Sequence, residues 1–258
     1  MKVVILAGGF GTRISEESHL VPKPMIEIGE RPLLWHIMKQ YSFFGYHDFI
    51  ICSGYKQHVI KEFFSNYSLY TSDITFDLSN NSTTLHNRYT EPWRVTVVDT
   101  GLNTMTGGRV KRIKDYIGDE TFMLTYGDAV SDVNINDLVA YHHSHKKTAT
   151  LTAVQPGGRF GLLEINDDST INRFTEKVKE EGGWINSGYM VLEPAIFDLI
   201  DGDATVFEKE PLERATAQGN LVAYCHNGFW QCMDTMREKA LLEELWQSGE
   251  APWKLWKE

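Results

Sequence analysis

The sequence predicts an α/β fold: a Rossmann-like, mixed but mostly parallel sheet flanked by helices, with β/α elaborations toward the C-terminus. Short apolar runs alternate with helical patterns of about ten residues in the first half of the chain, which is typical of βαβ units. The 258 residues are 42% hydrophobic, so a large core can form, and no linker rich in Pro, Gly and Ser divides them. We therefore expect a single domain over residues 1–258.

The first half contains short apolar runs that predict five buried strands. They are Val3–Leu6, Phe49–Cys52, Val95–Val98, Phe122–Thr125 and Ala149–Val154. Apolar residues three and four positions apart predict the helices between them: Arg31–Phe44, which Pro32 opens and Gly45 ends, His58–Phe64, Gly107–Ile117, which two glycines open, and Ile135–His145. Ligands of such sheets bind beyond the carboxyl ends of the strands, so the residues that follow each strand are the first candidates for a site.

The second half changes character, with several strands and few helices between them. The strands expected there are Gly161–Ile165, Ile171–Phe174, Ile185–Leu192 and Leu221–Tyr224, and the helices are Pro194–Ile200, Pro211–Gln218 and Met236–Ser248. The segment 66–92 is polar and irregular, and its pattern predicts no element. A subunit-contact loop and a substrate lid both fit it.

The charge and the cysteines exclude several classes of protein. Lys and Arg number 25 and Asp and Glu number 35, so the net charge is −10, and we expect neither nucleic acid nor a membrane surface as a partner. A polyanion would need a local cluster of basic residues and a metal ion. The apolar run Val3–Ala7 is too short for a secretion signal, and three scattered cysteines predict free thiols in a reducing cytoplasm.

The loop after the first strand has the composition of a phosphate-binding loop. Residues 6–13 are LAGGFGTR, and glycines let the backbone approach an anion closely. Arg13 adds donors for phosphate oxygens, and Lys23 lies between two prolines that restrict its backbone. Ile14 stands where a dinucleotide fingerprint needs Gly or Ala, and the Gly-Lys pair of a P-loop is absent. A glycine turn with a solvated arginine is the alternative; Arg13 and Lys23 together favour phosphate.

Two further positions carry charge close to predicted strand and helix ends. Asp128 follows the strand Phe122–Thr125, and a carboxylate there, facing a phosphate loop, is where Mg²⁺ would be held. A turn or cap residue is the alternative for Asp128. Arg109 lies at the glycine-led start of a helix, where anions bind, so we expect it to contact a nucleotide unless it is a surface arginine.

The loop LAGGFGTR, followed by Pro22-Lys23-Pro24, resembles the signature of the sugar-1-phosphate nucleotidylyltransferases. The resemblance covers essentially the whole chain and continues in residues 24–29, 126–128, 174–177 and 230–235, which are PMIEIG, YGD, FTEK and WQCMDT. The chain looks most like the members that use CTP and glucose 1-phosphate, on the segments EPW, VDTG, TGGR, GRFG and APWK that begin at residues 91, 98, 106, 158 and 251.

The resemblance implies a fold of the nucleotide-diphospho-sugar transferase type and Mg²⁺-assisted transfer of CMP from CTP to glucose 1-phosphate, giving CDP-glucose and pyrophosphate. It implies a nucleotide-binding half over about 1–155 and a sugar-phosphate-binding and C-terminal half over about 156–258. The implied catalytic residues are Arg13, Lys23, Asp128 and Lys177. The implied nucleotide contacts are Leu6, Ala7, Gly8, Gly9, Gly11, Thr12, Arg13, Lys23, Arg109 and Gly127; the sugar-phosphate contacts are Glu176, Lys177 and Asn186; the metal ligands are Asp128 and Asp234.

Some alternatives stay open. Asp234 also suits the N-cap of the last helix. Val21 and Val178 stand where members of the family carry Lys and Pro, which weakens the assignment of the substrates. UTP, dTTP or another hexose 1-phosphate would fit the same chemistry. A glycosyltransferase would depend on the D-x-D segment Asp201-Gly202-Asp203, which we interpret as a turn, and a non-enzymatic sugar-nucleotide sensor is the third possibility. The resemblance also implies a homo-oligomer, a hexamer in the cytidylyltransferases, while the late histidines of Ile135–His145 predict a solvated face.

Overall fold

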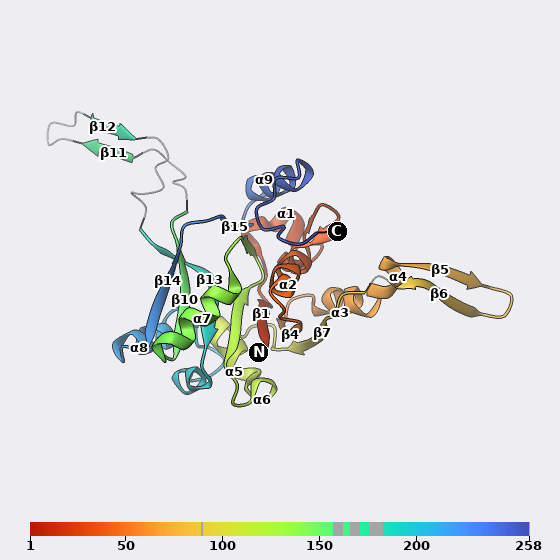
Figure 1. Cartoon of the computed structure of the whole chain (residues 1–258), viewed down its shortest axis with the longest axis horizontal. Helices are drawn as coiled ribbons and strands as arrows, with labels where there is room; N and C mark the ends of the chain where they lie inside the picture. Colours follow the sequence, from red (N-terminus) through yellow and green to blue (C-terminus); the bar gives the residue numbers. More distant parts are fainter. Residues whose placement is uncertain (89, 157–161, 166–170, 176–182, 258) are drawn as a thin grey trace.

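The structure is a computed structural model that describes residues 1–88, 90–156, 162–165, 171–175 and 183–257, with the backbone alone for residues 13, 15, 16, 88, 162–165 and 171–175. A seven-stranded sheet in the order β14–β10–β13–β8–β1–β4–β7 forms its centre (Figure 1). The strands are β1 Val3–Ala7, β4 Asp48–Ser53, β7 Arg94–Asp99, β8 Phe122–Tyr126, β10 Ala149–Val154, β13 Ile185–Leu192 and β14 Leu221–His226.

The sheet is mixed but mostly parallel, as the sequence predicts. β1 runs parallel to β4 and β8, β4 to β7, and β10 to β14, whereas β13 is antiparallel to both of its neighbours. β1 lies between β4 and β8, so the segments that follow these three strands emerge at the same edge. That edge is where ligands of such sheets bind.

Alternate residues of the central strands face opposite layers of helices, as the two-residue period of a strand requires. Val3 and Ile5 of β1 pack in a cluster with residues of α2 Leu33–Phe43, α3 Gln57–Ser65, α7 Ile135–His145 and α9 Met236–Gln247. Val4 and Leu6 pack in a second cluster with residues of α5 Thr106–Arg112, α6 Lys114–Ile117, η4 Pro194–Leu199 and α8 Glu210–Ala217. The sheet is therefore buried on both faces, and its ligand site must open at an edge.

Several short helices and two-stranded sheets lie outside the seven-stranded sheet. They are η1 Thr12–Ile14, α1 Ser15–Ser18, η2 Lys23–Met25, β2 Glu27–Ile28 paired with β3 Arg31–Pro32, β9 Ala129–Ser131 paired with β15 Trp230–Cys232, and β11 Leu162–Ile165 paired with β12 Ile171–Thr175. The segment for which the sequence predicts no element forms α4 Tyr67–Thr71 and a hairpin of β5 Ser72–Asp77 and β6 Ser82–Arg88. That hairpin extends away from the sheet (Figure 1, yellow-brown). No helix in the described residues is long and apolar enough to cross a membrane.

The structure corrects two predicted details and refines a third. The helix predicted over Gly107–Ile117 is interrupted at Ile113, where the backbone N–H donates to Val110 three residues back. The helix predicted over Pro194–Ile200 is present as the 3-10 helix Pro194–Leu199. His142, predicted on a solvated face, is 1% exposed, and its ring nitrogens contact the Thr150 hydroxyl at 2.8 Å and Glu193 at 3.0 Å. Burial lowers the pKa of His142, so the neutral ring fits there.

Candidate active site

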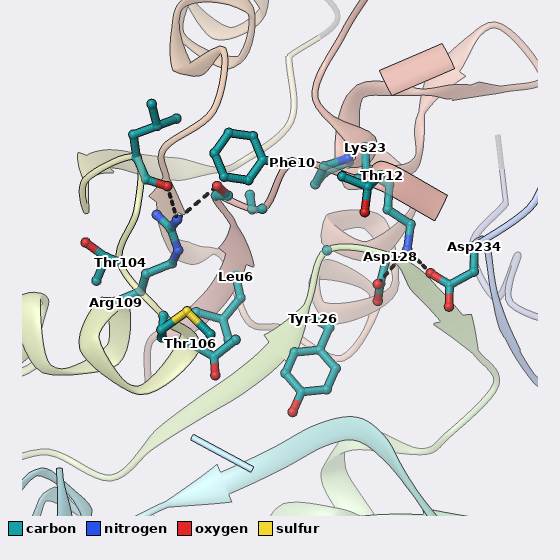
Figure 2. A pocket seen from close by; sticks show the side chains of 18 of the residues that line it. Leu6, Phe10, Thr12, Lys23, Thr104, Thr106, Arg109, Tyr126, Asp128 and Asp234 are labelled. Carbon is teal, nitrogen blue, oxygen red and sulfur yellow. Dashed lines mark hydrogen bonds and ion pairs between the residues drawn. The ribbon is translucent and has the colours of Figure 1, made fainter. Parts of the chain in front are cut away.

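A cavity of about 660 Å³ lies at the carboxyl ends of β1 and β8. Its walls come from the loop after β1, the turn that carries Lys23, the loop between β7 and α5, and the end of β8 (Figure 2). Many of the residues that the sequence analysis selects line it: Leu6, Ala7, Gly8, Gly9, Gly11, Thr12, Lys23, Arg109, Gly127, Asp128 and Asp234. The fold thus gathers in one place positions that are more than two hundred residues apart in the chain.

Glycines shape the loop after β1 for two different reasons. Gly11 has φ of +66°, a conformation that favours glycine, and its carbonyl accepts from the Ser18 hydroxyl at 2.9 Å. A Cβ at Gly8 would come within 2.2 Å of the Arg109 guanidinium, so only glycine leaves that side chain its place. The backbone of Arg13 lies in η1, directly after this loop. The role of its side chain stays a prediction.

Lys23 holds the two acidic side chains of the site together. Its side chain is buried, and its Nζ donates to Asp128 Oδ2 at 2.7 Å and to Asp234 Oδ1 (Figure 2). Burial alone would lower the pKa of Lys23, but the charges and hydrogen bonds of the two carboxylates outweigh it, and the pKa is raised. Lys23 is therefore an ammonium at neutral pH. Prolines on both sides fix the backbone that delivers it.

The pairing of β9 with β15 explains why Asp128 and Asp234 meet. Cys232 lies opposite Ala129, and the N–H of Met233 donates to the carbonyl of Asp128 at 2.8 Å. The N-cap of α9 is Thr235, whose side chain completes a capping box with Glu238. The alternative for Asp234 as N-cap is therefore wrong. Its carboxylate points into the cavity instead.

Asp128 and Asp234 fit a divalent cation. Both reach the same ammonium, so their oxygens converge on one point of positive charge. Carboxylate oxygens are ligands that Mg²⁺ accepts, and it commonly takes only one or two from the protein. The described residues contain no cluster of three or more His, Cys, Asp or Glu that could hold a metal ion. Water and substrate oxygens would have to complete the coordination.

Arg109 organises the wall of the cavity. It is 4% exposed, and its Nη1 and Nη2 donate to the carbonyls of Gly101 at 2.7 Å, Gly8 at 3.0 Å and Leu102 at 3.2 Å, and to the Thr100 hydroxyl at 2.8 Å. The side chain thus ties the loop after β1 to the loop after β7. Contact of Arg109 with a nucleotide stays a prediction.

One wall of the cavity contains residues for which the sequence predicts no role. Tyr126 Oη donates to Glu208 Oε1 at 2.6 Å, and Thr106 Oγ1 donates to Glu208 Oε2 at 2.7 Å. Asn186, predicted to face the sugar, donates to Tyr126 Oη at 3.4 Å. Tyr126, Thr106 and Glu208 all line the cavity. No sequence pattern marks Glu208, because it lies in an irregular segment before α8.

The remaining predicted positions are of two kinds: some lie outside the described residues, and others form ion pairs on the surface. Glu176 and Lys177 lie outside the described residues, so their assignment to the sugar phosphate stays a prediction. Asp201 and Asp203 lie in the predicted turn, and each binds an arginine through both oxygens: Asp201 pairs with Arg214, and Asp203 with Arg112. Carboxylates held in this way on the surface are poor metal ligands, which counts against the glycosyltransferase alternative.

A cavity that combines a glycine-rich loop, an ammonium and two carboxylates suits a polyanionic nucleotide with its metal ion, and this defines a phosphate-transferring class of enzyme. The chain belongs to the nucleotidyl transferase family, whose model matches residues 2–246. The family that the sequence motifs indicate is therefore confirmed.

The chain is also similar to individual members of this family and to solved structures. The chain is 55% identical over 257 residues to the glucose-1-phosphate cytidylyltransferase of Salmonella typhimurium, which covers 99% of this chain and 100% of the relative. It is 41% identical over 257 residues to the probable glucose-1-phosphate cytidylyltransferase of Bacillus subtilis, with the same coverage. The solved structure of UDP-glucose pyrophosphorylase complexed with UDP-glucose matches with a TM-score of 0.69 at 15% identity, over 96% of this chain and 98% of that one. This last match shows the fold alone, and the predicted fold is confirmed.

Proposed function

We propose that this chain transfers CMP from CTP to glucose 1-phosphate, giving CDP-glucose and pyrophosphate. One observation carries the proposal: the chain is 55% identical, over nearly its whole length, to a protein named for that activity. The cavity supports it independently, because it combines a loop suited to phosphates with an ammonium and two convergent carboxylates. The division into a nucleotide-binding half over about 1–155 and a sugar-phosphate-binding half after it belongs to this proposal.

The chemistry needs positive charge and alignment more than it needs a general base. A phosphate oxygen of the sugar phosphate attacks the α-phosphorus of CTP in line, and pyrophosphate leaves. That oxygen is already anionic at neutral pH, so the barrier comes mainly from the repulsion of two polyanions and from their alignment. The loop Gly8–Gly11 would receive the triphosphate, Arg13 the leaving pyrophosphate, and Lys23 the α-phosphate. Lys177 would align the attacking phosphate, with Glu176 and Asn186 on the sugar.

Asp128 and Asp234 would hold Mg²⁺, which would supply positive charge that neutralises part of the charge of the phosphates. Lys23 lies between these carboxylates in the structure, so its ammonium serves as their positive partner when no nucleotide is present. Because Lys23 reaches both carboxylates, it would also lie close to a phosphate that a cation held by this pair brings in. We therefore assign Lys23 two successive partners, the carboxylates and then the nucleotide.

We also propose a cytoplasmic homo-oligomer, a hexamer by the resemblance to the cytidylyltransferases. All three cysteines are free, and Cys52 is buried, which fits a reducing compartment. The extended β5–β6 hairpin exposes large apolar side chains, since Phe76 is 59% and Leu78 is 87% exposed. Apolar residues in such a position suit contact with a second copy of the chain. Light scattering of the purified protein would give the number of copies.

The test is pyrophosphate release with Mg²⁺ and glucose 1-phosphate, with CTP, UTP, dTTP, ATP and GTP in separate assays. Release with CTP alone is the expected result. Release with another nucleotide would support the mechanism but would show that the proposed specificity for CTP is wrong. No release from folded protein with any of them would direct attention to other sugar phosphates and then to the sensor alternative.

A further inference from the structure

Three polar side chains from distant parts of the chain meet on one wall of the cavity. Tyr126 ends β8, Thr106 begins α5, and Glu208 precedes α8. The Glu208 carboxylate accepts from Tyr126 Oη at 2.6 Å and from Thr106 Oγ1 at 2.7 Å, one donor on each oxygen. We call these three side chains the Glu208 group.

The Glu208 group lies away from the charges that suit phosphate. Lys23, Asp128 and Asp234 mark one end of the cavity, and the loop 102–106 with Arg109 closes the other. In Figure 2 Tyr126 lies between these two ends. A nucleoside triphosphate whose phosphates sit at the Lys23 end would extend its base toward the loop 102–106. Its ribose would then pass the Glu208 group.

The chemistry of Glu208 suits a pair of hydroxyl groups. A carboxylate accepts at about four lone-pair positions, and Tyr126 and Thr106 occupy two of them, which leaves two for a ligand. Burial, and then the charge of Glu208, raise the pKa of Tyr126, so its hydroxyl stays a donor that orients the carboxylate. The 2′ and 3′ hydroxyls of ribose are adjacent donors, which matches an acceptor with two positions left.

We propose that the Glu208 carboxylate, oriented by Tyr126 and Thr106, accepts hydrogen bonds from the ribose hydroxyls of CTP and so selects ribonucleotides over deoxyribonucleotides. The proposal rests on the proposed function, because it places a nucleoside triphosphate in the cavity. A site whose acceptor is oriented toward a hydroxyl group disfavours analogues that lack this hydroxyl, because they lose a hydrogen bond to a charged group.

A purely structural role explains the Glu208 group less well. The two loops that carry Thr106 and Glu208 are already joined through other atoms: Met105 N–H donates to Asp203 O at 2.8 Å, Gly107 N–H to Thr205 O at 2.9 Å, and Phe207 N–H to Thr106 Oγ1 at 2.9 Å. Added Cβ atoms at Gly107 or Gly108 would come within 2.8 Å of this second loop, so the backbones are in close contact. The carboxylate of Glu208 is not needed to hold them.

The experiment compares CTP with 2′-deoxy-CTP and 3′-deoxy-CTP in the pyrophosphate assay. Glu208→Gln keeps the shape of the side chain but replaces one acceptor oxygen by a donor. We expect kcat/KM with CTP to fall about tenfold or more, since CTP loses the hydrogen bonds of two hydroxyls to a charged group, while each deoxy analogue, which has only one of these hydroxyls, loses less. Tyr126→Phe should reduce the same preference less, because the carboxylate remains. Glu210→Gln, an exposed carboxylate two residues away, is the matched control and should leave the preference unchanged.

Three outcomes would overturn the proposal. Equal losses with CTP and both deoxy analogues would show a structural role. An unchanged preference with a raised KM for glucose 1-phosphate would mean that Glu208 contacts the hexose. Wild-type enzyme that accepts 2′-deoxy-CTP and 3′-deoxy-CTP as well as CTP would show no selection at all. Failure of the proposed function is a separate result: if the wild type works only with another nucleotide, the ribo and deoxy forms of that nucleotide still test Glu208.

Discussion

The two ends of the cavity are built in different ways. At the phosphate end, the loop Gly8–Gly11 and Asp128 directly follow adjacent parallel strands, and Lys23 lies in a proline-bounded turn close after the first of them. At the end where we propose that the nucleoside binds, here called the nucleoside end, Thr106, Tyr126 and Glu208 come from three segments that meet through contacts between loops. The first end depends on local sequence and strand order, and the second on tertiary packing.

This difference predicts different kinetic effects at the two ends. Charge at the phosphate end acts on the reacting groups, so its loss should lower kcat. Hydrogen bonding at the nucleoside end acts on a part of the substrate that does not react, so its loss should raise KM for the nucleotide and change nucleotide preference. Variants at the two ends therefore test whether the cavity is divided in this way.

The largest effect is expected at the phosphate end. Lys23→Ala or Asp128→Asn should each lower kcat/KM at least ~10²-fold, about 2.7 kcal/mol of transition-state stabilisation, mainly through kcat. The physical reason is the loss of the positive charge that we propose at the α-phosphate in the first variant, and of a proposed metal ligand in the second. Steady-state pyrophosphate release measures both parameters.

Asp201→Asn is the matched control for these variants, because Asp201 is an exposed carboxylate paired with Arg214. It should change kcat/KM less than about twofold, as surface ion pairs contribute little. Near-normal turnover by a folded Asp128→Asn enzyme would remove Asp128 from the metal site. A large loss in Asp201→Asn would revive the glycosyltransferase alternative.

Much of the fold is predictable from the sequence because the sheet is buried on both faces. Its strands are short apolar runs, and the sequence predicts each of the seven to within one or two residues at either end. The hairpin β5–β6 is not predictable in this way, because Phe76 and Leu78 are exposed and its polar pattern resembles a loop. His142 is wrongly predicted for the opposite reason: it is a polar side chain buried with polar partners.

The same physical distinction governs the site. Lys23, Asp128 and the glycine loop belong to motifs that are contiguous in the sequence. Asp234 needs the pairing of β9 with β15 to reach Asp128, and only the resemblance to a family indicated it in advance. Glu208 has neither a motif nor a strand next to it, so no sequence signal could have identified its place. Contacts between loops are the part of this site that sequence patterns leave out.

The kinetic comparison of the two ends is valid only if a change in the stability of the whole fold does not change nucleotide preference. A change of pH can test this, because it alters the stability of the protein. His36 is buried, its Nε2 donates to Ile28 O at 2.8 Å, and its Nδ1 accepts from Trp253 Nε1 at 3.3 Å. Burial lowers the pKa of His36 to about 4. Below the ordinary histidine pKa of about 6.5, the unfolded chain binds a proton that the folded chain does not, so the free energy of unfolding falls as pH decreases toward 4.

Between pH 7 and pH 5 this group should remove about 2 kcal/mol from the free energy of unfolding. Denaturant titrations at both pH values measure it. In His36→Gln the decrease should be smaller by about that amount, whereas His143→Gln, at an exposed position of α7, should behave as the wild type does. The same pH dependence in His36→Gln and wild type would show that His36 titrates normally in the folded protein. The preference for CTP over deoxy-CTP should not follow the change in stability.

The smallest expected effect concerns the cation that occupies the phosphate end before the nucleotide arrives. The Lys23 ammonium lies within hydrogen-bond reach of both proposed metal ligands, so a divalent cation must compete with it. Two unit charges about 4 Å apart near a protein surface repel by roughly 4 kcal/mol, and solvent screening reduces this. Removing the ammonium should therefore tighten the binding of a divalent cation about tenfold in the absence of nucleotide.

Mn²⁺ is a suitable probe, because its binding can be followed by electron paramagnetic resonance without any turnover. We expect Lys23→Ala to bind Mn²⁺ more tightly than the wild type, and Lys23→Ala with Asp128→Asn to lose that gain. Lys39→Ala is the matched control. Lys39 is a partly buried lysine whose Nζ pairs with Glu91 Oε1 at 2.7 Å, and it does not line the cavity. Equal Mn²⁺ affinity in wild type and Lys23→Ala would mean that the carboxylates held by Lys23 are not the metal ligands. The phosphate end would then bind its nucleotide through Lys23 and the glycine loop, and the metal ion would bind elsewhere. The division of the cavity into two ends would then be wrong at the phosphate end, where sequence motifs predict the site best.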